Sequence, residues 1–143
     1  MSVAYKGLEN VHRVEAWNAP LREMDGHLLQ SWQWGEFKSR YGWRAERVAY
    51  PDVGQPRAMA QVLFQHRGPV SVGYIPRGPA FVEGDGDAVT ALFQAIDRIA
   101  HRHRALFLIV EPNRPLPLGG TFKQNGFVRG GAHIQPERTV QVP

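Results

Sequence analysis

The sequence predicts one mixed α/β domain of the α+β kind, in which helices flank a mostly antiparallel central sheet. Its length of 143 residues suits a single domain. Residues 43–50, 57–67 and 70–75 have the composition of strands and are separated only by short turns, which implies an antiparallel meander. Residues 89–104 carry the clearest helical periodicity, and the unbroken apolar run at 105–110 follows at once.

The first 24 residues are expected to hold one strand and one short helix. Residues 11–16 alternate between apolar and polar side chains, as a half-buried strand does. Residues 17–24 are compatible with a short helical turn, because Asn18 is a suitable cap and Pro20 is tolerated near a first turn. A strand followed by a short helix is therefore the prediction for this part of the chain.

A second helix is predicted directly before the first meander strand. Ser31 is a good N-cap residue, and Trp34, Phe37 and Tyr41 recur at helical spacing. Gly42 follows at the position where a helix commonly ends in a left-handed residue. The aromatic stripe is therefore expected on one face of a helix that leads into the meander.

The C-terminal half is expected to alternate helices and strands. The helix predicted over residues 89–104 has one apolar face, formed by Val89, Leu92, Phe93, Ile96, Ile99 and Ala100. Residues 105–110 (ALFLIV) are expected to form an interior strand that is buried on both faces. A short helix at 118–125 that ends at Gly126, and strands at 127–134 and 139–142, complete the expected order.

Composition excludes several classes of function. The chain has no cysteine, which excludes disulfides, thiol catalysis and cysteine-ligated zinc. It has no HExxH pattern, and His101 and His103 point to different faces of a helix, so no metal site is predicted. No apolar run approaches the roughly 20 residues that span a bilayer and no signal peptide is visible, so a cytoplasmic location is expected. The formal charge of +4, carried mostly by arginine, suits a phosphate-bearing partner.

Three local motifs resemble one family of enzymes, and the expected element order is that of a GNAT-like domain. The motifs are Gln30-Ser31-Trp32-Gln33-Trp34-Gly35-Glu36-Phe37-Lys38, Gly73-Tyr74-Ile75-Pro76-Arg77-Gly78-Pro79, and Gln135-Pro136-Glu137-Arg138-Thr139-Val140. In this order they resemble the first GNAT-like domain of the FemABX-type aminoacyltransferases, the methicillin-resistance-type Fem proteins that form peptidoglycan cross-bridges. Members of that family carry two such domains, and the resemblance over residues 1–143 covers only the first.

The resemblance implies a transferase that moves an amino acid from aminoacyl-tRNA to a nucleotide- or lipid-linked peptidoglycan precursor. Its implied partners are this precursor, aminoacyl-tRNA and a second GNAT-like domain, and it implies no cofactor. Because an aminoacyl ester is already activated, such catalysis needs positioning and charge stabilisation rather than a covalent intermediate. The catalytic residues are not identified, and this domain alone is expected to be inactive.

Four residues are candidate contacts to the precursor. The lysine that matches Lys38 contacts the precursor's diphosphate in the family, and Trp34 and Tyr41 border it on the aromatic stripe. Arg77 lies between prolines in a stiff segment that could direct a guanidinium at an anion. The alternatives remain open: Lys38 could be a solvated surface residue, and Arg77 could tie a strand end to its loop.

Two other functions remain to be weighed. An acyl-CoA-dependent GNAT N-acyltransferase needs a glycine-rich turn that binds pyrophosphate, whereas residues 83–87 (EGDGD) carry three carboxylates that suit a helix cap. A non-enzymatic domain that binds a precursor or a partner chain is the third possibility. The basic cluster Arg98, Arg102, His103 and Arg104 fits the C-terminal dipole of a helix better than RNA contact.

Overall fold

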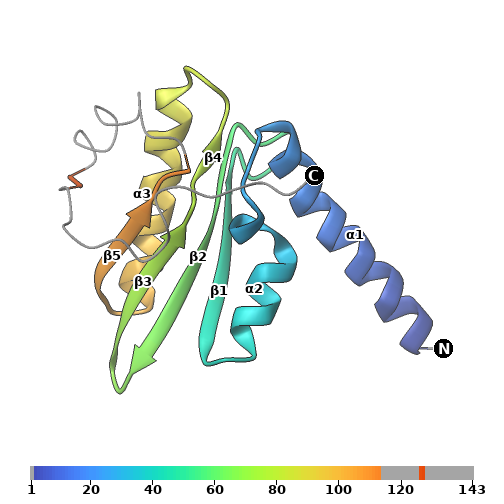
Figure 1. Cartoon of the computed structure of the whole chain (residues 1–143), viewed down its shortest axis with the longest axis horizontal. Helices are drawn as coiled ribbons and strands as arrows, with labels where there is room; N and C mark the ends of the chain where they lie inside the picture. The colour runs from blue at the N-terminus through green and yellow to red at the C-terminus, as the bar shows by residue number, and fades with distance from the viewer. Residues whose placement is uncertain (1, 114–125, 128–143) are drawn as a thin grey trace, which may run out of the picture.

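The computed structural model describes residues 2–113 and 126–127, and Figure 1 shows their arrangement. The helices are α1 (Ser2–Glu23), the short 3-10 helix η1 (Leu28–Gln30), α2 (Trp32–Ser39) and α3 (Gly86–Arg102). The strands are β1 (Trp43–Tyr50), β2 (Ala58–Arg67), β3 (Val70–Pro76), β4 (Ala80–Phe81) and β5 (Ala105–Glu111). The three meander strands, the aromatic helix and the long helix therefore form where their sequence patterns predict them.

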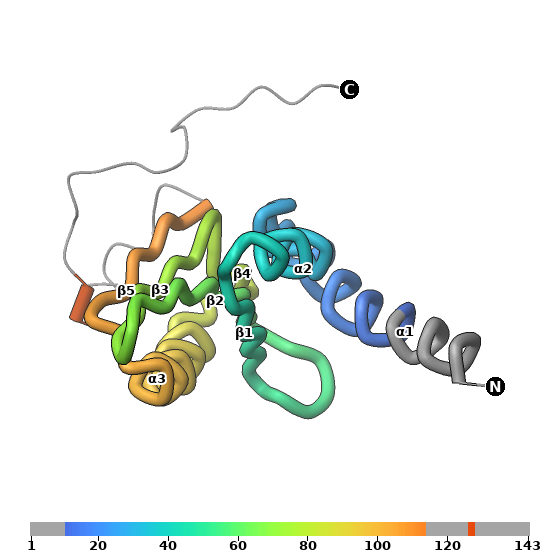
Figure 2. Tube along the Cα trace, turned by 90° about the horizontal axis from the view of Figure 1, so that it is seen from below, coloured from blue at the N-terminus to red at the C-terminus, as the bar shows by residue number. Residues whose placement is uncertain are grey.

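The strands form one mixed sheet in the order β1-β2-β3-β5, with β4 paired to the start of β2. The β1/β2, β2/β3 and β2/β4 pairs are antiparallel, and β3/β5 is parallel. In Figure 2, α3 lies on one face of this sheet and α2 lies on the other, while α1 extends away beyond the β1 edge. The prediction of a mostly antiparallel sheet flanked by helices is confirmed.

Each face of the sheet has its own apolar core, because strand side chains alternate between the two faces. On the α3 face, Phe64 and Ile75 of the sheet and Leu92 and Ile96 of α3 are fully buried. Burial of such a side chain stabilises the fold by about 1.5–3 kcal/mol, so this layer contributes strongly to stability. On the α2 face, a smaller cluster centres on Met59, Trp17 and Leu21, with which α1 is attached to the sheet.

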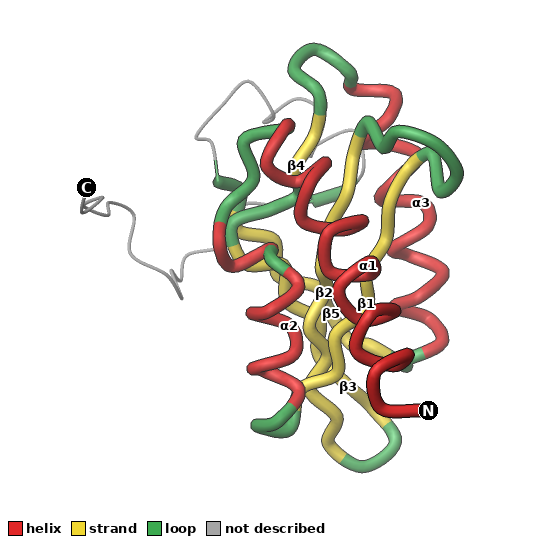
Figure 3. The backbone as a smooth tube through the Cα atoms, turned by 90° about the vertical axis from the view of Figure 1, so that its right-hand side faces the viewer, coloured by secondary structure: helices red, strands yellow, loops and turns green. Residues whose placement is uncertain are grey.

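The predicted strand at residues 11–16 is wrong, because these residues belong to α1. Six residues of alternation are a weak signal, and the stronger one runs through Trp17, Leu21 and Met24, which are buried at helical spacing. Val11 is 60% exposed, so the alternation reflects a surface position. Figure 3, seen from the side on which α1 lies, shows α1 and α2 running along the strands.

The predicted caps of that first helix also change. Asn18 lies inside α1 and uses its side chain to hold α2, whose Trp32 N–H donates to Asn18 Oδ1 at 2.9 Å. Pro20 also lies inside α1, which continues to Glu23. Ser31, by contrast, is the N-cap of α2 as predicted, since its Oγ accepts from the Trp34 N–H at 3.2 Å. α2 ends at Ser39, before Tyr41 and Gly42, and Gly42 adopts a φ of 87°.

The prediction that residues 105–110 form a strand is confirmed, but the prediction of burial on both faces is wrong. Leu106 and Phe107 are 68% and 54% exposed, and β3 is the strand neighbour of β5 among the described residues. An irregularity in the β3/β5 register falls at this point, between the pairs Ser71↔Ala105 and Gly73↔Leu108. An apolar run alone did not predict how much of the strand is covered.

The elements predicted at 118–125, 127–134 and 139–142 lie outside the described residues, apart from Phe127. The Phe127 ring lies 4.8 Å from the ring of Phe93 on α3.

Candidate functional site

A buried polar network fastens α2 to the sheet, and Gln30 is its centre. The Gln30 side chain is fully buried. Its Nε2 donates to the carbonyl oxygens of Pro76 at 2.8 Å and of Gln61 at 3.2 Å, while its Oε1 accepts from the Gln61 N–H at 2.8 Å. The indole N–H of Trp17 donates to the Gln30 carbonyl at 2.8 Å. All polar atoms of this side chain therefore have partners, as a buried amide requires.

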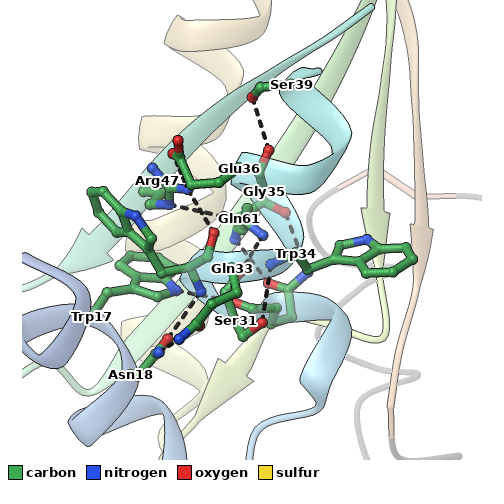
Figure 4. Close-up of polar contacts among 12 residues, drawn as sticks. Trp17, Asn18, Ser31, Gln33, Trp34, Gly35, Glu36, Ser39, Arg47 and Gln61 are labelled. Atoms are coloured by element: carbon green, nitrogen blue, oxygen red, sulfur yellow. Dashed lines mark hydrogen bonds and ion pairs between the residues drawn. The ribbon is translucent and has the colours of Figure 1, made fainter. Parts of the chain in front are cut away.

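Arg47 of β1 extends the network beneath α2, as Figure 4 shows. Its Nε donates to Gln61 Oε1 at 2.8 Å, and its Nη2 donates to the Trp32 carbonyl at 3.1 Å and to Glu36 Oε1 at 3.0 Å. The guanidinium also stacks on the Trp32 ring at 3.5 Å. Burial lowers the pKa of Arg47, and the hydrogen bond and charge of Glu36 oppose that shift. The network gives α2 one fixed position on β1 and β2.

Two of the three sequence motifs meet at Gln30. The Pro76 carbonyl that accepts from Gln30 begins the Pro-Arg-Gly-Pro segment, and a Cβ on Gly78 would lie 2.6 Å from Gln30 Cδ. Gly35 is equally constrained, because a Cβ there would lie 2.2 Å from Gln61 Oε1. Gln30, Gly35 and Gly78 are therefore motif residues that build the scaffold rather than contact a ligand.

Lys38, Trp34 and Tyr41 are brought together at the end of α2, as the aromatic stripe predicts. The ammonium of Lys38 lies 5.4 Å from the Trp34 ring centre and 5.6 Å from the Trp43 ring centre. The Phe37 ring links Trp34 and Tyr41, with centre-to-centre distances of 5.4 and 5.0 Å. Trp43 was not among the sequence candidates, although its place directly after the Gly42 turn could have indicated it.

The indole N–H of Trp34 is buried and has no hydrogen-bond partner among the described residues. In Figure 4 the Trp34 ring points away from the Arg47 and Trp17 side of α2. At this end of α2 the ammonium of Lys38 is therefore the donor that suits an oxygen-rich anion.

Arg77 lies elsewhere, at the carboxyl ends of β3 and β5. The Gly78 N–H donates to the Glu111 carbonyl at 3.1 Å, and Arg77 has a φ of 53°, in the left-handed region that bulky residues seldom adopt. Arg77 lines a small hollow of about 10 Å³ with Met24 and Phe81. Burial, and secondly the charge of Arg77, lower the pKa of His27.

The structure therefore does not bring Arg77 and Lys38 to one point. Lys38 lies at the level of Gln65 on β2, because it contacts Trp43 and Trp43 pairs with Gln65. Arg77 lies near the level of Gln61 on β2, because the carbonyls of Gln61 and of the preceding Pro76 both accept from the Gln30 side chain. Four residues along a strand span about 13 Å. A ligand that touches both cations must be extended along the strands.

A larger hollow, of about 580 Å³, lies between α1 and α2. The carboxylates of Glu15 and Glu36 line it together with Arg40. Two carboxylates disfavour a diphosphate there, so the Lys38 surface is the better phosphate site.

The acidic turn before α3 acts as a helix cap. Asp85 Oδ1 accepts from the Ala88 N–H at 3.0 Å, and the carboxylate forms an ion pair with Arg57. The hydrogen bond from Arg57 and that from Ala88 lower the pKa of Asp85. The helix N-terminus that would bind a pyrophosphate is therefore occupied by the chain's own carboxylate.

Within residues 2–113 and 126–127, no three histidine, aspartate or glutamate side chains gather as a metal site. No described helix is both long and apolar enough to cross a bilayer.

Comparison with known proteins gives concordant results. Residues 15–125 match the model of the FemAB family. The chain is 30% identical over 132 residues to the lipid II:glycine glycyltransferase of Staphylococcus aureus, a match that covers 83% of this chain and 31% of that protein. The chain thus spans about a third of the length of the curated relatives it matches.

Two solved structures are similar in fold. The crystal structure of FemX superposes with a TM-score of 0.61 at 31% identity, covering 70% of this chain and 25% of that one. An acetyltransferase of Trypanosoma brucei superposes with a TM-score of 0.51 at 16% identity, covering 74% and 76% of the two chains. The second likeness shows a GNAT-like fold and nothing further.

Proposed function

Because the chain belongs to the FemAB family, we propose that it is the first of two GNAT-like domains of an aminoacyltransferase of peptidoglycan synthesis. The full-length enzyme transfers an amino acid from aminoacyl-tRNA to a peptidoglycan precursor and so extends the cross-bridge. The similarity to lipid II:glycine glycyltransferase and to FemX supports this choice of reaction. The proposal includes a cytoplasmic location, because charged tRNA is made there.

The observation that carries the proposal is the position of Lys38 between Trp34 and Trp43. An ammonium held over two indole rings has lost much of its freedom but keeps its donors for a ligand. We assign it to the diphosphate of the precursor, with the Trp34 ring beside the ammonium and Tyr41 as an exposed aromatic neighbour.

The buried network fixes the position of Lys38 by fixing the helix that carries it. α2 is held by Gln30 and Arg47 at its start and along its sheet-facing side, so its last turn has a fixed position relative to the sheet. Positioning matters because a displacement of about 1 Å can lower a rate roughly a hundredfold. This domain would therefore hold and orient the precursor, and no cofactor is needed because the ester of aminoacyl-tRNA is already activated.

Arg77 is the second proposed contact. It would meet another anionic group of the same precursor, about 13 Å from the diphosphate, if the precursor extends along the strands. Its constrained backbone would hold the guanidinium in one direction.

The acyl-CoA alternative has less support. The carboxylate of Asp85 caps α3 and pairs with Arg57, so the helix N-terminus already has an anion. A pyrophosphate would be repelled there.

The test is precursor binding by the full-length protein with substitutions at Lys38. We expect Lys38→Ala to weaken binding of a diphosphate-linked precursor by about 1.5–3 kcal/mol, or roughly 10- to 150-fold. Stability should fall by no more than about 1 kcal/mol, the value of an exposed cation–π contact. Lys38→Met keeps the stem over the rings and removes only the charge, so it should bind as weakly as Lys38→Ala.

Arg13→Ala is the control, since Arg13 is an exposed cation on a different helix, α1. It should bind the precursor as well as the unchanged protein does. If Lys38→Met binds normally, the ammonium is a surface charge and the proposed site is wrong.

A further inference from the structure

The charges of this domain are divided between its two ends. The turns at residues 38–44, 66–70 and 101–105 lie at one end of the sheet and contain no aspartate or glutamate. We name these three turns the cationic end; its basic residues are Lys38, Arg40, Arg44, Arg67, Arg102 and Arg104, with His66, His101 and His103. The opposite end carries seven carboxylates against three arginines, Arg22, Arg57 and Arg77; the carboxylates are those of Glu23, Asp25, Asp52, Glu83, Asp85, Asp87 and Glu111. The domain is thus polarised along its strands.

Direct contacts hold the three turns together. The Ser71 N–H donates to the Arg104 carbonyl at 3.1 Å, and His66 Nε2 lies 3.0 Å from His103 Nδ1. The turn at 38–44 joins them through strand pairing, because Trp43 lies opposite Gln65, the residue before His66. In Figure 1 the three turns lie together at the lower end of the sheet, where α3 and β3 begin or end. They therefore form one surface.

The positive charge of this surface is exposed and largely uncompensated. The five arginines of the cationic end are all exposed. Four carboxylates lie nearby, and each has a partner outside the five arginines. Glu46 Oε1 is 2.8 Å from His103 Nε2, and Asp97 Oδ2 is 3.6 Å from His101 Nδ1. Glu15 and Glu36 line a hollow with Arg40, but they form ion pairs with Arg22 and Arg47. None of the four carboxylates forms an ion pair with an arginine of the cationic end among the contacts within the described residues.

Exposed apolar side chains flank the arginines. Tyr41 lies within the cationic end and is 66% exposed. Leu106 and Phe107 come directly after the turn at 101–105 and are 68% and 54% exposed. Arginines beside exposed aromatic and aliphatic side chains are typical of surfaces that lie in a bilayer interface. RNA would also use the charges and the aromatic rings, but an exposed leucine offers no stacking surface for a base.

We propose that the cationic end docks on an anionic bilayer surface and so presents Lys38 to a precursor diphosphate held at that surface. The proposal rests on the proposed function, because it takes Lys38 as the diphosphate contact. A diphosphate that joins a sugar to a membrane lipid lies at the level of the headgroups. Lys38 reaches that level only if its end of the domain faces the membrane, and this is the end at which the arginines gather. Charge and substrate geometry thus require the same orientation.

The experiment is vesicle co-sedimentation of the 143-residue chain. Vesicles of phosphatidylcholine and phosphatidylglycerol in equal amounts are compared with vesicles of phosphatidylcholine alone. We expect binding to the anionic vesicles only, and we expect it to weaken as salt shortens the Debye length from about 10 Å at 0.1 M to about 3 Å at 1 M. Arg40→Gln and Arg67→Gln should each weaken binding about fivefold, and together about 25-fold, as expected for cations near an anionic surface.

Arg13→Gln is the matched control, because it removes the same charge from α1, and it should change binding less than twofold. Equal binding to both kinds of vesicle, no binding to either, or equal effects of all three substitutions would overturn the proposal. So would tighter binding of the chain to tRNA than to anionic vesicles with the same sensitivity to Arg40 and Arg67, because the surface would then be an RNA interface.

The failure of this proposal is distinguishable from that of the proposed function. Binding of a water-soluble, nucleotide-linked precursor through Lys38 is measured without vesicles. If that precursor binds and vesicles do not, only the membrane orientation is wrong. If vesicles bind through Arg40 and Arg67 and neither form of precursor depends on Lys38, the cationic end is a membrane surface but the proposed function is wrong.

Discussion

Replacement of Gln30 by leucine should destabilise the domain far more than an ordinary polar-to-apolar change. Leucine keeps most of the volume of this fully buried side chain but removes its amide. The Gln61 N–H then has no partner in the network, and the Pro76 and Gln61 carbonyls each lose a donor. A buried N–H without a partner costs about 1–3 kcal/mol, and each lost hydrogen bond costs about 1 kcal/mol or less once water is considered. We therefore expect a loss of about 2–4 kcal/mol.

That loss is large relative to the whole stability of a domain, which is about 5–15 kcal/mol. It corresponds to a fall in Tm of roughly 5–15 °C for a chain of this length. Urea unfolding followed by the fluorescence of the four tryptophans measures it, because Trp17 contacts Gln30 directly. Glutamate has the same shape as glutamine, but Gln30→Glu replaces the donating nitrogen by an oxygen that faces two carbonyl oxygens. The free energy of unfolding should therefore fall further in Gln30→Glu than in Gln30→Leu.

Gln55→Leu is the control for this experiment. Gln55 is exposed and its side chain bonds the exposed Glu23 at 2.7 Å, so its replacement should change stability by less than about 0.5 kcal/mol. If Gln30→Leu costs no more than Gln55→Leu, or if Gln30→Glu is as stable as the unchanged protein, then the amide does not join the two motifs and the reasoning is refuted.

Three further predictions concern pH, activity and cofactor. The pKa of His27 is lowered in the folded chain, where its Nδ1 accepts from the Leu29 N–H at 3.1 Å. As the pH decreases, the unfolded chain therefore binds a proton at this histidine before the folded chain does. The contribution of His27 to the free energy of unfolding should be fully present above about pH 6.5 and should be lost as the pH falls below that value. His27→Asn keeps a cap acceptor and should remove that part of the pH dependence in urea titrations; an unchanged dependence would contradict the assignment. The chain alone should fold but should not transfer aminoacyl groups from charged tRNA to precursor, as followed by mass spectrometry, and turnover at the rate of a full-length homologue would show that the complete site lies within these residues. Calorimetry should detect no acetyl-CoA binding at physiological concentrations, because Asp85 and Arg57 occupy the helix N-terminus, and a micromolar Kd would favour the acyl-CoA alternative.

The sequence predicted best the elements whose type and limits follow from their own residues, through an apolar stripe, a cap or bounding turns. α3 has an unbroken apolar stripe and a capping aspartate, and the meander strands are bounded by glycine and proline turns, so tertiary contacts add little new information. It predicted residues 11–16 wrongly, because a short alternating run carries less information than the buried Trp17 and Leu21 of the same helix. The exposure of Phe107 also could not be predicted, because it depends on what lies beside β5.

The candidate site was predicted in part for similar reasons. Trp34 and Lys38 share a helix, so their proximity follows from spacing alone. Trp43 joins them only through the packing of α2 on β1, and the separation of Arg77 from Lys38 depends on the strand register. The structural role of Gln30 was not visible in the motif, because its partners lie 31 and 46 residues further along the chain.

The closeness of Gly35 to Gln61 limits how this protein can evolve. Any side chain at position 35 would lie within 2.2 Å of Gln61 Oε1 and within 2.8 Å of the Arg47 guanidinium. A lineage that gains even an alanine there must move the Gln61 amide or shorten residue 61, and either change releases Arg47 from one of its partners. Substitutions at position 35 are therefore expected to be accompanied by changes at position 61 across descendants.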